Sequence, residues 1–177
     1  CVELSGVNAT SSIGLFFQAV QTAPNVVTKN PSNSIVKGLV INRFRRAIQI
    51  DGDGGGANPV VPPTGIGIYG NFLGTDTTGL TDVTSSTSQA IRLEGANATL
   101  IGSSQAADRN IISGYGAGIL INQNSNPFNS TYAPAGRGGG SNVITNNYIG
   151  TDKTGLAALG HTGAGIAVQG PDNQILT

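Results

Sequence analysis

Short stretches of alternating apolar and polar residues recur along the whole chain. Four of them share one pattern, Ala/Gly-Ile-x-Ile/Leu/Val, and begin at positions 47, 90, 118 and 165. A period of two is typical of β-strands, in which successive side chains point to opposite faces. Helical periodicity is confined to a weak run around Leu15–Val20. The pattern therefore predicts an all-β fold built from short strands.

A second type of strand precedes each of these four, so the chain repeats a larger unit. These strands are expected over residues 34–41, 65–74, 110–115 and 142–150, and a fifth copy begins at Asn173–Leu176. Gly and Asn are concentrated between the strands, and both tolerate the left-handed backbone that sharp corners require. Recurrence of such a unit, expected at about 20–30 residues, indicates a solenoid, here one of β-coils.

One sequence motif occurs twice in nearly the same form, as GNFLGTDTTGL at Gly70–Leu80 and as NNYIGTDKTGL at Asn146–Leu156. The other two coils lack it, so the separation of 76 residues between Asn71 and Asn147 spans two coils. Stacked coils place like residues over like, so both Asn residues are predicted at corners, in a hydrogen-bonded ladder. At roughly 4.8 Å per coil, Asp76 and Asp152 are expected roughly 10 Å apart on one edge.

These repeated motifs, from the N-x-I strand through G-N-x-I-G-T-D-x-T-G to G-I-x-I, resemble the right-handed parallel β-helix repeat proteins of bacterial secreted and cell-surface type. Residues 98–121 resemble a shorter coil of that family. The resemblance implies a right-handed parallel β-helix of roughly five to six coils with a pectate-lyase-like architecture. Residues 1–177 are expected to form one such domain within a longer chain.

Two insertions interrupt the repeats, at residues 51–64 and 122–140. Both follow an Ile-x-Ile strand directly, so both are predicted to leave the same edge of the stack. Long Gly- and Pro-rich loops on a rigid scaffold often carry binding residues. The second insertion contains Phe128, Tyr132 and Arg137, a contact set suited to a sugar, a peptide or a neighbouring subunit. The alternative is a disordered loop without function.

Charge and composition narrow the functional classes. Nine basic residues balance nine acidic ones, and only 10% of the chain is charged, which argues against a nucleic-acid-binding surface. No apolar stretch approaches the ~18 residues of a membrane span. Cys1 is either a lipidation site or a truncation point. The sequons at Asn8, Asn97 and Asn129 are possible glycosylation sites, in keeping with an extracellular or cell-surface protein.

The carboxylates do not form a recognisable catalytic set. Asp76 and Asp152 could span the separation of a glycosidase acid/base pair, but identical surroundings would not separate their pKa values. Hydrogen bonds to their own backbone turn are the favoured role for both. Arg92 and Glu94 share one face of a strand and are expected to pair.

No metal or cofactor site is expected. The acidic start of Asp51–Gly56 lacks the distal glutamate of a calcium loop. His161 is the only histidine and has no Cys or second His nearby in the sequence with which to share a metal, so a solvated loop position is expected.

The sequence therefore favours a non-enzymatic structural protein: a stalk, surface-layer or filament subunit that associates with its own copies or with further coils. Adhesion to glycans is an additional role that such a protein could have. The alternative is a protein that binds polysaccharide or degrades it as a lyase or hydrolase. Members of one fold differ in activity, so the resemblance does not decide between these functions.

Overall fold

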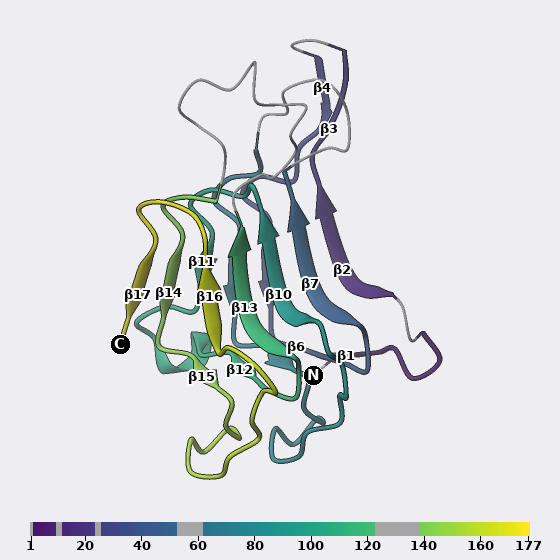
Figure 1. Ribbon diagram of the computed structural model, residues 1–177, viewed down its shortest axis with the longest axis vertical. Helices are drawn as coiled ribbons and strands as arrows, with labels where there is room; N and C mark the ends of the chain where they lie inside the picture. The colour runs from purple at the N-terminus through teal and green to yellow at the C-terminus, as the bar shows by residue number, and fades with distance from the viewer. Residues whose placement is uncertain (1, 10–11, 24–25, 53–61, 123–138) are drawn as a thin grey trace.

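The computed structural model describes residues 2–9, 12–23, 26–52, 62–122 and 139–177. It is an all-β structure with three parallel five-stranded sheets and a single short 3₁₀-helix, η1 (Ala106–Asp108), among the described residues. Figure 1 shows the strands of the three sheets stacked side by side, with the two chain ends at different places along the stack.

Each sheet takes its strands from successive passes of the chain. Sheet 1 contains β1 (Val2–Ser5), β6 (Leu39–Asn42), β9 (Phe72–Leu73), β12 (Ile111–Ile112) and β15 (Tyr148–Ile149). Sheet 2 contains β2 (Ile13–Gln18), β7 (Arg46–Asp51), β10 (Gln89–Glu94), β13 (Ala117–Asn122) and β16 (Ile166–Val168). Sheet 3 contains β5 (Ile35–Lys37), β8 (Gly67–Tyr69), β11 (Leu100–Ile101), β14 (Val143–Thr145) and β17 (Gln174–Leu176).

The chain visits sheets 1, 2 and 3 in that fixed order, and every new strand pairs in parallel with the strand one pass earlier. This arrangement is compatible with a parallel β-helix. The antiparallel hairpin of β3 (Val20–Ala23) and β4 (Val26–Lys29) is inserted between β2 and β5. It extends beyond the stack in Figure 1. The weak helical periodicity around Leu15–Val20 does not give a helix, because β2 extends to Gln18 and β3 begins at Val20.

The parallel register stacks like side chains into interior rows. One row of sheet 2 consists of Leu15, Ile48, Ile91, Ile119 and Ile166. Sheet 1 contributes Leu4, Ile41, Leu73, Ile112 and Ile149. Sheet 3 contributes Val36, Ile68, Ile101, Ile144 and Ile175. The central members of each row are fully buried, so these rows form the hydrophobic core.

The second strand type of the sequence proves to be two strands separated by a corner. The stretch 34–41, for example, contains β5 in sheet 3 and β6 in sheet 1, joined at Gly38. Equivalent corner positions are occupied by Gly70 and Asn146, and all three residues have positive φ angles of 72°, 60° and 52°. At Gly70 an added Cβ would lie 2.6 Å from the carbonyl oxygen of Ala107, so glycine is required there for space as well.

An asparagine ladder runs along the corner between sheets 3 and 1. Asn71 donates from Nδ2 to Oδ1 of Asn110 at 3.0 Å, and Asn110 donates likewise to Asn147 at 2.8 Å. Each Oδ1 also accepts a backbone amide of the preceding pass, as Asn71 does from Leu39 at 3.0 Å. The ladder therefore joins successive passes through side chains in addition to the sheet hydrogen bonds. A shorter asparagine ladder lies at the corner between sheets 2 and 3, where Nδ2 of Asn142 donates to Oδ1 of Asn173 at 2.9 Å.

Candidate binding groove

The connections from sheet 1 to sheet 2 form a groove along one edge of the stack. Its larger part, about 460 Å³, is lined by Gly6 and Val7 after β1, by Arg43–Arg45 after β6, and by residues 83–87 before β10. A second cleft of about 280 Å³ lies on the other side of residues 84–87 and reaches Tyr115 and Thr162. The two clefts share residues 84–87, so together they follow the stack across several passes.

The segment between the two clefts is held in place by hydrogen bonds to the turn after β6. The hydroxyl of Ser86 donates to the carbonyl of Arg45 at 2.7 Å. The backbone amide of Arg43 donates to the hydroxyl of Thr84 at 2.9 Å, and the Thr84 side chain is almost fully buried. Because these contacts join residues about forty positions apart, the groove exists only in the folded stack.

Arg43 brings a partly exposed positive charge to the groove. Its guanidinium lies 3.6 Å from the carboxylate of Glu3 and donates to the side-chain oxygen of Asn42 at 3.1 Å. Its backbone has a φ of 59°, which is uncommon for a residue other than glycine. An ion pair this exposed contributes little free energy, so the guanidinium can turn to a ligand at small cost. The arrangement suits a hydroxylated or anionic ligand.

Phe44 contributes an aromatic ring to the apolar part of the groove, and this ring fits against two glycines. An added Cβ at Gly6 would lie 2.7 Å from the ring, and one at Gly14 would lie 3.1 Å from it. Larger residues at these positions would therefore displace the ring. Phe44 also packs against the core, which fixes its position in the wall of the groove.

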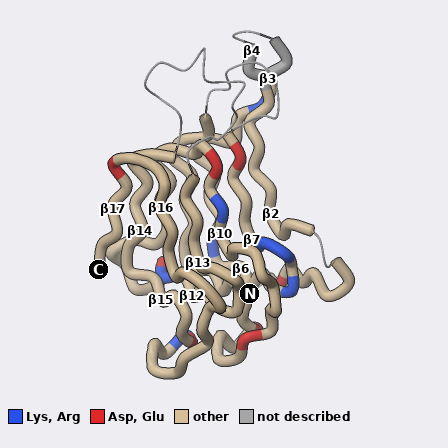
Figure 2. Tube along the Cα trace, in the orientation of Figure 1, with Lys and Arg blue, Asp and Glu red and all other residues tan. Residues whose placement is uncertain are grey.

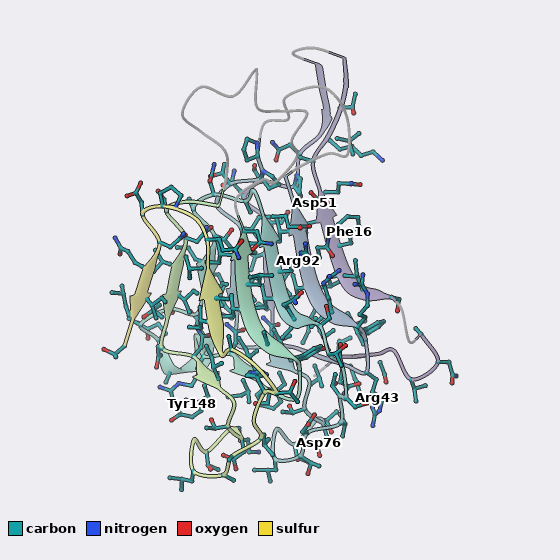
Figure 3. The ribbon with its side chains drawn as sticks, viewed as in Figure 1. Phe16, Arg43, Asp51, Asp76, Arg92 and Tyr148 are labelled. Atoms are coloured by element: carbon teal, nitrogen blue, oxygen red, sulfur yellow. The ribbon has the colours of Figure 1, made fainter. Side chains whose placement is uncertain are left out.

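The outer face of sheet 2 carries most of the remaining strand-borne charge (Figures 2 and 3). Arg92 and Glu94 form an ion pair there, as the alternation predicted. Arg46 is buried beside them and donates to the side-chain oxygen of Gln49 at 3.0 Å. Burial, followed by repulsion from Arg92 and Arg45, lowers the pKa of Arg46 to about 10, while Glu94 opposes the shift. These charged side chains therefore mainly pair with one another and with neighbouring polar groups.

The two repeated GTD phrases form similar turns at the edge between sheets 1 and 2. The Asp76 carboxylate accepts the Thr78 hydroxyl at 2.8 Å, and Asp152 accepts the Thr154 hydroxyl at 2.7 Å. Both also accept backbone amides from the following residues. The turns contact each other, because the Lys153 amide donates to the Gly79 carbonyl at 2.9 Å. The strands that precede the two turns, β9 and β15, are nevertheless two passes apart, because β12 lies between them.

Electrostatics does not separate these two carboxylates into an acid and a base. Burial opposes ionisation of Asp76, but hydrogen bonds from Thr78 and the turn amides outweigh it and lower its pKa. The hydroxyl of Thr154 is the main cause of the lowered pKa of Asp152. A general acid needs a raised pKa, so neither carboxyl group suits that role.

His161 is not the solvated loop residue that the sequence suggested. Its ring is half-buried, with Nε2 3.1 Å from the Ile112 carbonyl and Nδ1 3.4 Å from the Tyr115 amide. A neutral ring with its proton on Nε2 satisfies both contacts. Burial lowers the pKa of His161, which favours that neutral form. The residue therefore ties its loop to the preceding pass.

The two insertions both connect sheet 2 to sheet 3, after β7 and after β13. The hairpin β3–β4 makes the same connection one pass before the first insertion. Phe128, Tyr132, Arg137 and the sequon at Asn129 lie outside the described residues. Of the other sequons, Asn8 is exposed, whereas Oδ1 of Asn97 accepts two backbone amides at 3.0 and 3.1 Å.

No family model, curated protein or solved structure matches the chain. The groove and its neighbourhood must therefore be interpreted from their own chemistry. In the described part of the chain no group of three or more His, Cys, Asp or Glu side chains is placed to hold a metal ion. The same residues contain no helix with the length and apolar character needed to cross a membrane.

Proposed function

We propose that the chain is a right-handed parallel β-helix, each pass being one coil, that serves as an extracellular or cell-surface structural element such as a stalk, surface layer or filament subunit. The observation that carries this proposal is the stacking of like residues across the passes. Interior aliphatic rows and the ladder of Asn71, Asn110 and Asn147 join each coil to the next. Such nearest-neighbour contacts are what stabilise solenoids.

Resistance to proteolysis tests the structural role. A folded stack with a continuous core leaves a protease only the loops to cut. Digestion of the purified chain with a protease of broad specificity should therefore stop at nicked but associated fragments that keep their β-sheet circular dichroism. Complete digestion at the same rate as that of an unfolded chain would contradict a structural role.

Binding of polysaccharide is the second candidate function, and the groove favours it. Hydroxyl groups line both clefts, and Arg43 and Phe44 add a cation and a ring, the groups that sugars contact. The insertion residues Phe128, Tyr132 and Arg137 remain part of this hypothesis. Cleavage of the bound sugar by a lyase or hydrolase reaction is less favoured, because the carboxylates of Asp76 and Asp152 accept hydrogen bonds within their own turns.

A glycan array with the parent chain and two variants tests this second function. Loss of a charge-assisted contact in Arg43→Ala should weaken binding about tenfold or more. Lys153→Ala removes an exposed cation outside the groove and should bind as the parent does. Equal binding by all three proteins would exclude the groove as the glycan site. Release of sugar fragments that Asp76→Ala abolishes would instead establish an enzyme.

A further inference from the structure

The smaller of the two clefts contains a carboxylate that the turn around it does not require. Asp82 lines this cleft and follows the first GTD motif, and its backbone forms an antiparallel bridge with Thr75. The second GTD motif is followed by the same bridge, between Thr151 and Ala158. Ala158 thus occupies the position equivalent to Asp82, so the turn forms with or without a carboxylate there.

The Asp82 carboxylate is nevertheless held in one place. Its Oδ1 accepts the backbone amide of Thr84 at 2.8 Å. Gly114, in the connection one pass later, lies against it, because an added Cβ at Gly114 would be within 2.7 Å of both carboxylate oxygens. A carboxylate fixed in this way loses little freedom when a ligand binds to it.

No positive charge neutralises Asp82 within the described residues, where all three ion pairs involve other carboxylates. His161 is close enough to interact with the charge of Asp82, but burial lowers the pKa of His161 and favours its neutral form. The larger cleft has the opposite character, since Arg43 and Arg45 line it and none of its described lining residues is acidic. The sign of the charge therefore changes along the groove.

Tyr115 adds a second polar group without a partner to the smaller cleft. Its hydroxyl is close to Thr84 and Asp82, but it is buried and makes no hydrogen bond of good geometry within the described part of the chain. A buried hydroxyl without a partner is uncommon, because it costs free energy. A ligand in the cleft can supply the missing hydrogen bond, either itself or through one bound water.

An ammonium group matches this set of side chains. It is a compact cation with three donors, and the cleft offers it the Asp82 carboxylate together with the exposed residues Ser85 and Thr87, whose hydroxyls can accept hydrogen bonds. A calcium ion would need several more oxygen ligands and further negative charge, which a single carboxylate does not provide.

The walls of the cleft favour an amine on a sugar over an amine on a peptide. Its lining residues belong to none of the strands, so the cleft has no open strand edge with which a peptide backbone could pair. Hydroxyl side chains predominate instead, and these can exchange hydrogen bonds with the hydroxyls of a sugar ring. The shared residues 84–87 continue the same kind of surface into the larger cleft.

We propose that the smaller cleft is a subsite for the free amino group of a sugar, bound by the Asp82 carboxylate, and that a neighbouring hydroxylated or anionic unit of the same polysaccharide lies in the larger cleft. This inference rests on the polysaccharide-binding function proposed for the groove, and it names the class of sugar that the groove takes. Acetylation of the amine removes the charge that Asp82 attracts, so the subsite distinguishes free amino sugars from their N-acetylated forms.

Isothermal titration calorimetry with a matched pair of tetrasaccharides tests the proposal. Both consist of N-acetylglucosamine units, and one of them carries a single free amino group. The parent chain should bind the amino form at least about tenfold more tightly than the acetylated form. Asp82→Asn keeps an oxygen for the Thr84 amide but removes the charge, so it should bind both forms equally. Asp172→Asn removes an exposed carboxylate outside both clefts and should keep the preference of the parent.

The folding of the variants is checked by circular dichroism and thermal melting. Because Ala158 stands at the equivalent position of the second turn, Asp82→Ala serves as a second variant. It should melt close to the parent and should also lose the preference for the amino form.

Equal affinity of the parent for the two tetrasaccharides would overturn the ammonium subsite and leave polysaccharide binding by the groove intact. A preference that persists in Asp82→Asn would overturn it as well. Tighter binding of a lysine-containing peptide than of the amino tetrasaccharide, lost in Asp82→Asn, would assign the cleft to a protein partner instead. Absence of binding to every glycan of the array would refute the polysaccharide-binding function itself.

Discussion

Asn110 should contribute more to stability than any exposed asparagine of the chain, because it is the centre of the ladder. It is fully buried, and its Oδ1 accepts the backbone amide of Asn71 at 2.9 Å and Nδ2 of Asn71 at 3.0 Å. Its own Nδ2 donates to the carbonyl of Ile68 at 2.9 Å and to Oδ1 of Asn147 at 2.8 Å. Asn110→Ala removes all four hydrogen bonds at once.

The magnitude follows from the partners that are left behind. The Ile68 carbonyl still accepts the Gly102 amide, and Nδ2 of Asn71 still donates to Val36. The backbone amide of Asn71 has no such alternative among the hydrogen bonds of the described residues. An unsatisfied buried amide costs about 1–3 kcal/mol, and each other lost bond costs about 1 kcal/mol or less. Asn110→Ala should therefore lower the free energy of unfolding by about 3 kcal/mol.

Denaturation by urea, followed by circular dichroism, measures this loss. The midpoint for Asn110→Ala should fall well below that of the parent, with an unchanged slope. Asn147→Ala, at a less buried position, should show a smaller loss of about 1–2 kcal/mol. Asn8→Ala, at an exposed position, should stay within about 0.5 kcal/mol of the parent. If the Asn110→Ala and Asn8→Ala midpoints coincide, the ladder does not stabilise the stack.

Three further predictions concern single residues. Gly74→Ala should lower the melting temperature by the equivalent of about 2 kcal/mol or more, because φ is 95° and an added Cβ would lie 1.9 Å from the Ser113 carbonyl oxygen; an unchanged melting temperature would contradict this. Since the folded-state pKa of Asp152 is lowered, its stabilising contribution is complete above the unfolded-state value of about 3.9 and is lost as the pH falls through the folded value. In acid-unfolding curves between about pH 5 and pH 2, Asp152→Asn should therefore lose less stability than the parent. Parallel curves would argue against the hydrogen bonds assigned to the Asp152 carboxylate in its turn. The folded-state pKa of His161 is also lowered, so protons bind the unfolded state more readily and stability should decline as the pH falls below about 6.5. His161→Gln should remove that decline, and melting temperatures measured through this range will reveal whether it does.

Much of the fold could be predicted from the sequence, because each strand of sheet 2 has its own local signature. The Ile-x-Ile endings predicted β7, β10, β13 and β16, which now pair with one another in parallel. The doubled phrase likewise indicated a separation of two passes, and the register places Ile111 between Phe72 and Tyr148. Repetition makes these features visible, since each pass must bury the same face against the next.

The candidate groove could not be predicted in the same way. Arg43 and Thr84 are 41 residues apart and belong to different passes, and neither stands in a recurring motif. The contacts of His161 were missed for the same reason, since a lone histidine in a polar loop resembles a solvated one. Asn110 could be recognised as the middle of the ladder only from the strand register, because the residues that follow it in the sequence do not contain the GTD phrase.

The sequence by itself determined that the chain forms short parallel strands in a repeated unit, because alternation and the recurring Gly and Asn are local properties. Only the tertiary structure decided that each unit contributes one strand to each of three sheets. Residues 34–41 were expected to form one strand, although the chain turns at Gly38 from sheet 3 into sheet 1. A corner is set by one backbone angle and by what it packs against, and the second of these comes from other passes. The groove arises likewise from register between distant passes, which no local pattern records.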